Sequence, residues 1–189
     1  MTTQRPATPG QTIGPFFHYA LPFDGDAELV RPGHPDAVRL HGSVLDGAGE
    51  PVVDALVEIW QAAPDGSVVQ QPGSLHRDGW TFTGWGRAAT DDAGHYSFTT
   101  VAPGATEPGA APFFAVTVFA RGLLDRLFTR AYLPDVPALA DDALLARLDA
   151  DRRQTLIAVE DVTGHRFDIR LQGERETVFL TYPHSQEDA

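Results

Sequence analysis

The segment "ALVEIWQA" (55–62) alternates apolar and polar side chains. Val57 and Ile59 flank Glu58, and this period of two is typical of a β-strand with one face in a core. The same period recurs in "RFDIRL" (166–171), near the other end of the chain. Both segments therefore predict strands that contribute one face to a hydrophobic core.

Other short β-rich segments lie before, between and after these two. They are separated by turns that contain many of the 18 Gly and 15 Pro residues. We predict strands at 38–46, 55–62, 95–101, 113–120, 127–133, 155–161, 166–171 and 176–182. Only 141–154 has a helical period, with Leu144, Leu145 and Leu148 on one side. Many short strands with one short helix predict an all-β, prealbumin-like β-sandwich.

Two Gly-rich turns predict hairpins. "VLDGAGEPVVDALVEIW" (44–60) places two glycines between β-rich segments, and "TDDAGHYSF" (90–98) places Gly94 where a turn needs positive φ. Such hairpins occur in many sandwiches, including pure binding modules, so they indicate a fold and no chemistry.

Composition limits the class of protein. The 189 residues, 42% hydrophobic and 21% charged, suit one globular domain. The lack of cysteine excludes disulfides and thiolate metal sites, and a net charge of −12 argues against nucleic acid as a partner. No apolar run approaches membrane-spanning length and "MTTQRPATPG" (1–10) lacks an apolar targeting region, so we expect a soluble, cytoplasmic protein without membrane contact.

The common catalytic motifs are missing. None of the seven histidines lies in an HxH, HxxH or HxxxH pair, and neither a G-x-S-x-G elbow nor a phosphate-binding loop is present. Read from these patterns alone, the chain is a β-sandwich without an active site, and a non-catalytic binding or scaffold module stays open as an alternative.

Several longer motifs occur together and in order. They are "TPGQTIGPFFH" (8–18), "EIWQA" (58–62), "FTGWGR" (82–87), "TDDAGHYSFTT" (90–100), "FARGLLDRLFTRAYLPD" (119–135), "RQTLIA" (153–158) and "DIRLQGERETVFL" (168–180). Over about residues 8–181 the chain resembles the intradiol ring-cleavage dioxygenases. Iron-binding members of that family hold Fe(III) with two tyrosines and two histidines.

The positions that match those four ligands carry no metal-binding group. They fall on Val68, on Thr106, and on Phe113 and Ala115 or, in the neighbouring register, on Phe114 and Val116. These side chains cannot bind ferric iron in the family's mode. We therefore expect no metal on this chain, and we expect the former ligand positions to be packed as core.

The resemblance implies an iron-free alpha chain that pairs with a homologous beta chain bearing Fe(III). Together the two chains would cleave protocatechuate (3,4-dihydroxybenzoate) with O₂ to 3-carboxy-cis,cis-muconate. Residues 1–36 would form an N-terminal arm that contacts the partner, and 37–189 would form the sandwich domain. The alternatives are the scaffold module already named and a diverged, iron-free homologue without a dioxygenase role.

The resemblance also implies which residues of the arm reach the substrate pocket of the partner: Thr12, Gly14 and Pro15. The residue types suit that place, since Gly admits close approach of a flat ring and Pro forms a stiff apolar wall. Phe16 and Phe17 would anchor the arm by burial. The alternative is that "GPFF" (14–17) only caps one end of the sandwich.

Arg130, in "TRAYLPD" (129–135), matches the arginine that helps to bind the substrate carboxylate in the family. A guanidinium makes paired, charge-assisted hydrogen bonds to a carboxylate, which suits an anionic substrate and a strongly acidic protein. The alternative is a structural ion pair with Asp125 or Asp135. We expect Trp60 to lie in the core rather than to form a stacking platform.

Overall fold

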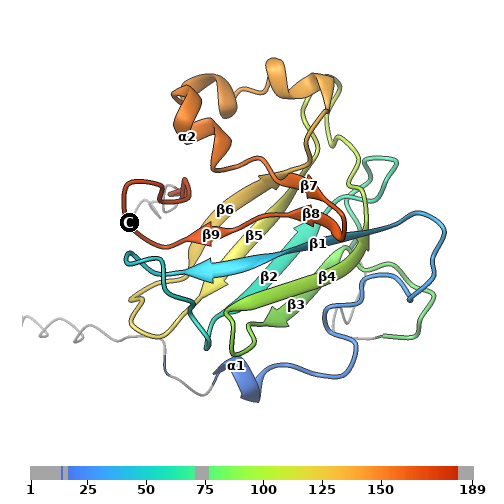
Figure 1. Ribbon diagram of the computed structural model, residues 1–189. Helices are drawn as coiled ribbons and strands as arrows, with labels where there is room; N and C mark the ends of the chain where they lie inside the picture. The colour runs from blue at the N-terminus through green and yellow to red at the C-terminus, as the bar shows by residue number, and fades with distance from the viewer. Residues whose placement is uncertain (1–13, 15–16, 71–76, 183–189) are drawn as a thin grey trace, which may run out of the picture.

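The structure, a computed structural model, describes residues 14, 17–70 and 77–182. These residues form two sheets (Figure 1), one in the order β4–β1–β8–β7 with β9 paired to β1, the other in the order β3–β2–β5–β6. The strands span Ala37–Leu45 (β1), Leu56–Gln61 (β2), Trp85–Ala89 (β3), His95–Val101 (β4), Phe113–Phe119 (β5), Leu127–Tyr132 (β6), Val159–Asp161 (β7), Gly164–Arg166 (β8) and Ile169–Arg170 (β9). The predicted β-sandwich is confirmed.

The core lies between the sheets and is built from alternate residues of the strands. In β2, Val57 and Ile59 are fully buried while Glu58 between them faces outward, as the sequence period predicts. From the other sheet, the hydroxyl of Tyr96 donates a hydrogen bond of 2.5 Å to the backbone oxygen of Phe167. Burial raises the pKa of Tyr96 well above its ordinary value. Tyr96 is therefore a neutral core residue.

Both predicted hairpins are wrong, although both turns form. The backbone N–H of Asp46 donates to the oxygen of Glu50 at 2.9 Å, but β1 then pairs with β4 while β2 pairs with β3 and β5. Gly94 has φ of 69°, as predicted, and its turn joins β3 in one sheet to β4 in the other. The turns cross the sandwich, because turn residues specify only a reversal, whereas packing selects strand partners.

The predicted helix over 141–154 is also wrong. A 3₁₀ turn at Pro137–Ala140 (η1) precedes the segment, which itself contains a 3₁₀ turn at Leu145–Arg147 (η2) and a short helix at Ala150–Gln154 (α2), separated by extended backbone at Leu148 and Asp149. The interruption lets Leu145 reach a second apolar cluster, formed with Ala111, Tyr132, Leu156 and Val178. No helix among the described residues is long and apolar enough to cross a membrane.

The C-terminal third contains less strand than its sequence predicts. Of 155–161 only β7 is strand, 166–171 is divided between β8 and β9, and 176–182 forms one isolated bridge, from Leu180 to Phe128. The sequence analysis missed β3, whose "WGRAA" (85–89) has no clear period of two. Both errors concern short strands, whose pairing depends on neighbours distant in sequence.

The segment ahead of β1 joins the sandwich through a few contacts. A short helix at Phe17–Ala20 (α1) places the Phe17 ring 6.1 Å from that of Phe119, and Leu29 is buried in the core. The anchoring role predicted for Phe17 is thus supported, while Phe16 lies outside the described residues. The domain boundary at residue 36 stays a prediction.

Two histidines that are distant in sequence meet on the first sheet. His41 Nδ1 lies 3.3 Å from His95 Nε2, and His41 Nε2 lies 3.3 Å from the carboxylate of Asp161 and 3.0 Å from the hydroxyl of Thr163. The contact between the rings needs one proton donor and one acceptor, so it requires a neutral ring. The pKa of His95 is lowered, and the largest cause is burial of the ring, which outweighs the effects of the neighbouring charges.

This pair predicts a loss of stability in mild acid. Because the pKa of His95 is lower in the folded chain, unfolded chains take up the proton first as the pH falls below about 6.5. The free energy of unfolding should therefore be smaller at about pH 5.5 than at about pH 7.5. Urea unfolding of wild type, His95→Gln and the control His34→Gln checks this. A pH dependence that survives in His95→Gln would contradict the assignment.

Candidate functional site

The candidate site lies on the outer face of the second sheet. A pocket of about 220 Å³ opens there between β2, β5 and the loops that follow β2 and precede β5. Its lining includes Trp60, Ala62, Val68, Thr106, Phe113 and Ala115. Phe113 and Ala115 face this pocket, whereas Phe114 and Val116 alternate with them and are buried in the core. Of the two registers left open by the sequence, only the first places both residues at this pocket.

The four positions identified as vacant metal-ligand positions come together here. Val68, Thr106, Phe113 and Ala115 lie on separate segments and line the same pocket. Their side chains offer aliphatic carbon, an aromatic ring and one hydroxyl, and ferric iron requires anionic oxygen or imidazole donors. Across the described ranges, no group of three or more His, Cys, Asp or Glu side chains could hold a metal ion. The pocket does not fit the iron of the family.

The prediction that these positions are packed as core is wrong. Val68 is 65% exposed, Phe113 is only half-buried, and Trp60, also expected in the core, is 45% exposed. Trp60 and Trp85 are paired across β2 and β3, with ring centroids 6.2 Å apart, and only Trp85 is buried. An exposed tryptophan beside an open apolar pocket is unusual for a lone domain and typical of an interaction surface.

Arg130 lies at the edge of this pocket. It is paired with Ala115 across β5 and β6, and its guanidinium carbon is 3.9 Å from the centroid of the Phe113 ring. Its Nε is buried and has no hydrogen-bond partner among the described residues. Neither Asp125 nor Asp135 forms an ion pair with it in this part of the chain, so the structural ion pair considered as an alternative is wrong. The half-buried guanidinium therefore has N–H groups for which the described residues provide no acceptor.

Two further side chains hold the guanidinium in place. Arg130 Nη1 donates to the hydroxyl of Tyr132 at 3.2 Å, and that hydroxyl lies 3.4 Å from Oδ1 of Asp142. The same oxygen of Asp142 accepts hydrogen bonds from the backbone N–H groups of Leu144 and Leu145, at 2.9 and 3.0 Å. Burial raises the pKa of Tyr132, so its hydroxyl keeps the proton that it can donate to Asp142. The row Arg130–Tyr132–Asp142 fixes the orientation of Arg130.

The sequence analysis missed Tyr132 and Asp142. Tyr132 follows Arg130 by two residues in "TRAY" (129–132), so the period of two could have placed both on one face. Asp142 carries no comparable signal, since it lies in an irregular segment and reaches Tyr132 only through the tertiary fold.

The predicted residues of the arm are not brought to this pocket by the described structure. Thr12 and Pro15 lie outside the described residues. Gly14 is exposed, and a Cβ added to it would meet no heavy atom within 4 Å. Their role stays a prediction, as does that of Arg130, which contacts the pocket residue Phe113 and is paired with Ala115.

Comparisons with known proteins agree with this architecture. The family model described as "Dioxygenase" matches residues 13–112. A protocatechuate 3,4-dioxygenase alpha chain from Pseudomonas putida is 39% identical, over 94% of this chain and 97% of that protein. A protocatechuate 3,4-dioxygenase beta chain from Burkholderia cepacia is 32% identical, over 91% of this chain and 78% of that protein.

A solved structure has the same fold. The dioxygenase domain of a dioxygenase–carbohydrate-binding fusion protein from Streptomyces sp. SirexAA-E superimposes with a TM-score of 0.58 and 26% identity. The match covers 88% of this chain and 98% of that domain. The overall fold of this chain is therefore similar to that of a dioxygenase domain.

Proposed function

The chain belongs to the intradiol ring-cleavage dioxygenase family, and from this we infer that it is the alpha subunit of a protocatechuate 3,4-dioxygenase. The whole enzyme cleaves protocatechuate between its two hydroxyl groups and adds both atoms of O₂, which gives 3-carboxy-cis,cis-muconate. The observation that carries the assignment is the pocket in which Val68, Thr106, Phe113 and Ala115 meet. It has the family's place for a metal centre without the side chains to bind one.

We propose that the Fe(III) of the enzyme is held by a homologous beta subunit. This chain has relatives among both alpha and beta chains, which supports a pair of related subunits in which one has lost its ligands. The exposed Trp60 and Val68 beside the pocket are also better explained by a partner that covers them than by a free domain. Iron and ring cleavage would then require the complex.

The part of the alpha subunit in this proposal is substrate recognition. Arg130 would bind the carboxylate of protocatechuate through the part of its guanidinium that Tyr132 does not occupy. With a net charge of −12 on the chain, long-range electrostatics oppose the approach of an anion, so a local guanidinium is needed to bind it. Thr12, Gly14 and Pro15 would line the substrate pocket of the iron-bearing beta subunit from the arm, as the family resemblance implies.

Iron content provides the test. The alpha chain purified alone should contain no stoichiometric iron, because its four ligand positions carry Val, Thr, Phe and Ala. Co-expression with a beta-type chain should yield a stable complex with bound iron, visible tyrosinate-to-iron absorption and ring-cleaving activity. Metal analysis and absorption spectra of the two preparations provide the comparison. A coloured, active alpha chain on its own would overturn the proposal, and failure to form any complex would favour a scaffold role.

A further inference from the structure

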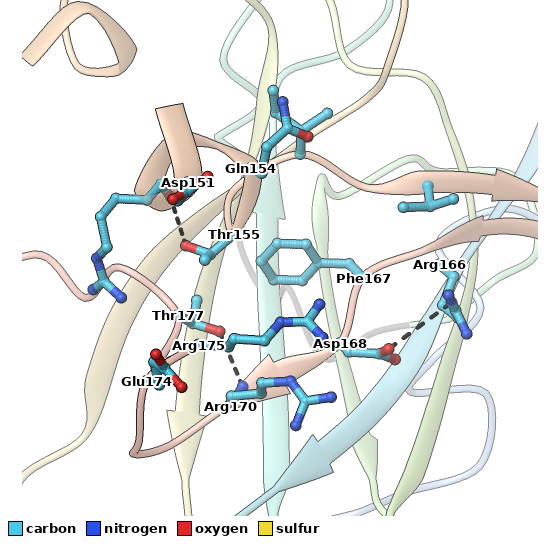
Figure 2. A pocket seen from close by; sticks show the side chains of 13 residues that line it. Asp151, Gln154, Thr155, Arg166, Phe167, Asp168, Arg170, Glu174, Arg175 and Thr177 are labelled. Atoms are coloured by element: carbon cyan, nitrogen blue, oxygen red, sulfur yellow. Dashed lines mark hydrogen bonds and ion pairs between the residues drawn. The ribbon is translucent and has the colours of Figure 1, made fainter. Parts of the chain in front are cut away.

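A second pocket, of about 570 Å³, lies where α2, β8, β9 and the turn after β9 meet (Figure 2). Four arginines line it: Arg152, Arg166, Arg170 and Arg175. Three carboxylates share the lining: Asp151, Asp168 and Glu174. The lining thus has an excess of positive charge in a chain whose net charge is −12. This arginine pocket has no role in the function proposed above.

The carboxylates do little to neutralise the arginine pocket. Asp168 accepts a hydrogen bond from the backbone N–H of Ser43 at 3.1 Å, and its other oxygen lies 3.9 Å from Nε of Arg166. Within the described part of the chain, neither Asp151 nor Glu174 forms an ion pair with any arginine. One oxygen of Asp168 therefore accepts a backbone hydrogen bond, and the other is too far from Arg166 for a strong ion pair.

Two guanidinium groups remain without an acceptor. Arg152 donates to the backbone oxygen of Glu176, but the described residues provide no hydrogen bond or ion pair for the guanidinium groups of Arg170 and Arg175. Arg170 is half-buried, and its backbone N–H is held by the hydroxyl of Thr177 at 2.9 Å. Figure 2 shows both side chains extending in the same direction across the pocket.

Such an arrangement favours an anionic ligand. Arg170 is half-buried and Arg175 is exposed, and among the described residues no carboxylate of the lining pairs with either guanidinium, so both groups keep N–H donors for a ligand. A carboxylate is the natural counter-ion, since its two oxygens match the fork of a guanidinium. The half-buried side chain of Ile157 and the exposed side chain of Val159, which share the lining, offer apolar surface to the carbon skeleton of a ligand, whereas Phe167 is buried in the core.

We propose that the arginine pocket binds a small organic anion that carries two or more carboxylates on an unsaturated carbon skeleton. The pocket volume lies in the range of small-molecule sites. Arg170 and Arg175 bind the carboxylates, and Ile157 and Val159 contact the carbon chain. Opening the ring of an aromatic carboxylate with O₂ yields such an anion with three carboxylates. That last identification rests on the proposed function, whereas the anion site itself does not.

The probe is cis,cis-muconate, an unsaturated dicarboxylate, titrated calorimetrically into the assembled alpha–beta complex. The variant is Arg170→Gln with Arg175→Gln in the alpha chain, and Arg126→Gln is the control, since Arg126 is exposed and contacts only the Phe128 ring in the described structure. We expect the double variant to bind the probe about tenfold more weakly or worse, because it loses two charge-assisted contacts. The control should stay within about twofold of wild type.

The outcomes separate the anion site from the proposed function. Equal binding by the double variant and wild type overturns the anion site. Failure of the double variant to assemble, with the folded alpha chain confirmed by circular dichroism, assigns the pocket to an acidic segment of the partner and also overturns it. Ring-cleaving activity is measured on the same preparations: an inactive wild-type complex that binds the probe through Arg170 and Arg175 supports the anion site and contradicts the proposed function.

Discussion

Replacing Arg130 by alanine in the assembled enzyme is expected to raise KM for protocatechuate by about 10- to 100-fold, with iron content unchanged. The range corresponds to the loss of a charge-assisted hydrogen bond, worth about 1.5–3 kcal/mol. The guanidinium is in place before the substrate arrives, because Phe113 stacks on it and Tyr132 orients it. Removing the side chain therefore removes a preorganised carboxylate partner rather than a mobile surface charge.

Steady-state kinetics with two ligands provide the control for this experiment. A catechol without a carboxylate should bind wild type and Arg130→Ala equally, because only the carboxylate contacts the guanidinium in the proposal. Tyr132→Phe should show a weaker effect in the same direction, since it keeps the charge and loses only the hydrogen bond that orients it. An unchanged KM for protocatechuate in Arg130→Ala would exclude Arg130 from the substrate site.

Replacing Gly42 by alanine is expected to destabilise the chain by about 3–5 kcal/mol, or to prevent folding. Gly42 lies in the middle of β1, where the backbone of Phe167 and Asp168 passes directly over it. A Cβ at Gly42 would fall well inside 3.0 Å of the backbone oxygen and carbon of Phe167. Since both are main-chain atoms, no side-chain rotation can relieve the clash.

The contacts around this crossing explain the size of the effect. The backbone N–H of Phe167 donates to the oxygen of His41 at 2.7 Å, and the hydroxyl of Tyr96 donates to the oxygen of Phe167. Any shift that makes room for a methyl group at Gly42 breaks at least one of these buried hydrogen bonds.

Urea unfolding of wild type, Gly42→Ala and Gly47→Ala measures this effect. Gly47 is the matched control, because a Cβ there meets only Cβ and Oε1 of Gln172, each at 3.2 Å, and a small shift of that residue relieves the contact. The unfolding midpoint should shift strongly for Gly42→Ala and little for Gly47→Ala. A loss below about 1 kcal/mol for Gly42→Ala would mean that the crossing is looser than the structure indicates.

The fold class and five of the strands could be predicted from the sequence because their signal is local. β1, β2, β4, β5 and β6 each lie within a predicted segment to within one residue, since apolar periodicity and turn residues act over a few positions. The helix over 141–154 failed for a related reason. Its leucines do contact apolar neighbours, but Leu145 is placed by a cluster of residues from four other segments.

Some residues of the candidate site could likewise be predicted from the sequence, and others could not. Single positions such as Arg130 and the vacant ligand positions could be named from family motifs, because a motif identifies residues one at a time. The choice between Phe113 and Phe114 could not be made, since it depends on which face of β5 turns outward. The row Arg130–Tyr132–Asp142 was missed because it joins a strand to an irregular segment.

The sequence by itself determined the β-sandwich and the loss of metal-binding side chains, because alternation and side-chain chemistry are properties of single positions and their near neighbours. Only the tertiary structure decided that the former ligand positions form an open pocket beside a preorganised Arg130, and that unpaired arginines meet in a second pocket. Both arrangements depend on how two sheets and the segments between them pack. Contacts across such distances leave no period in the chain that could be read in advance.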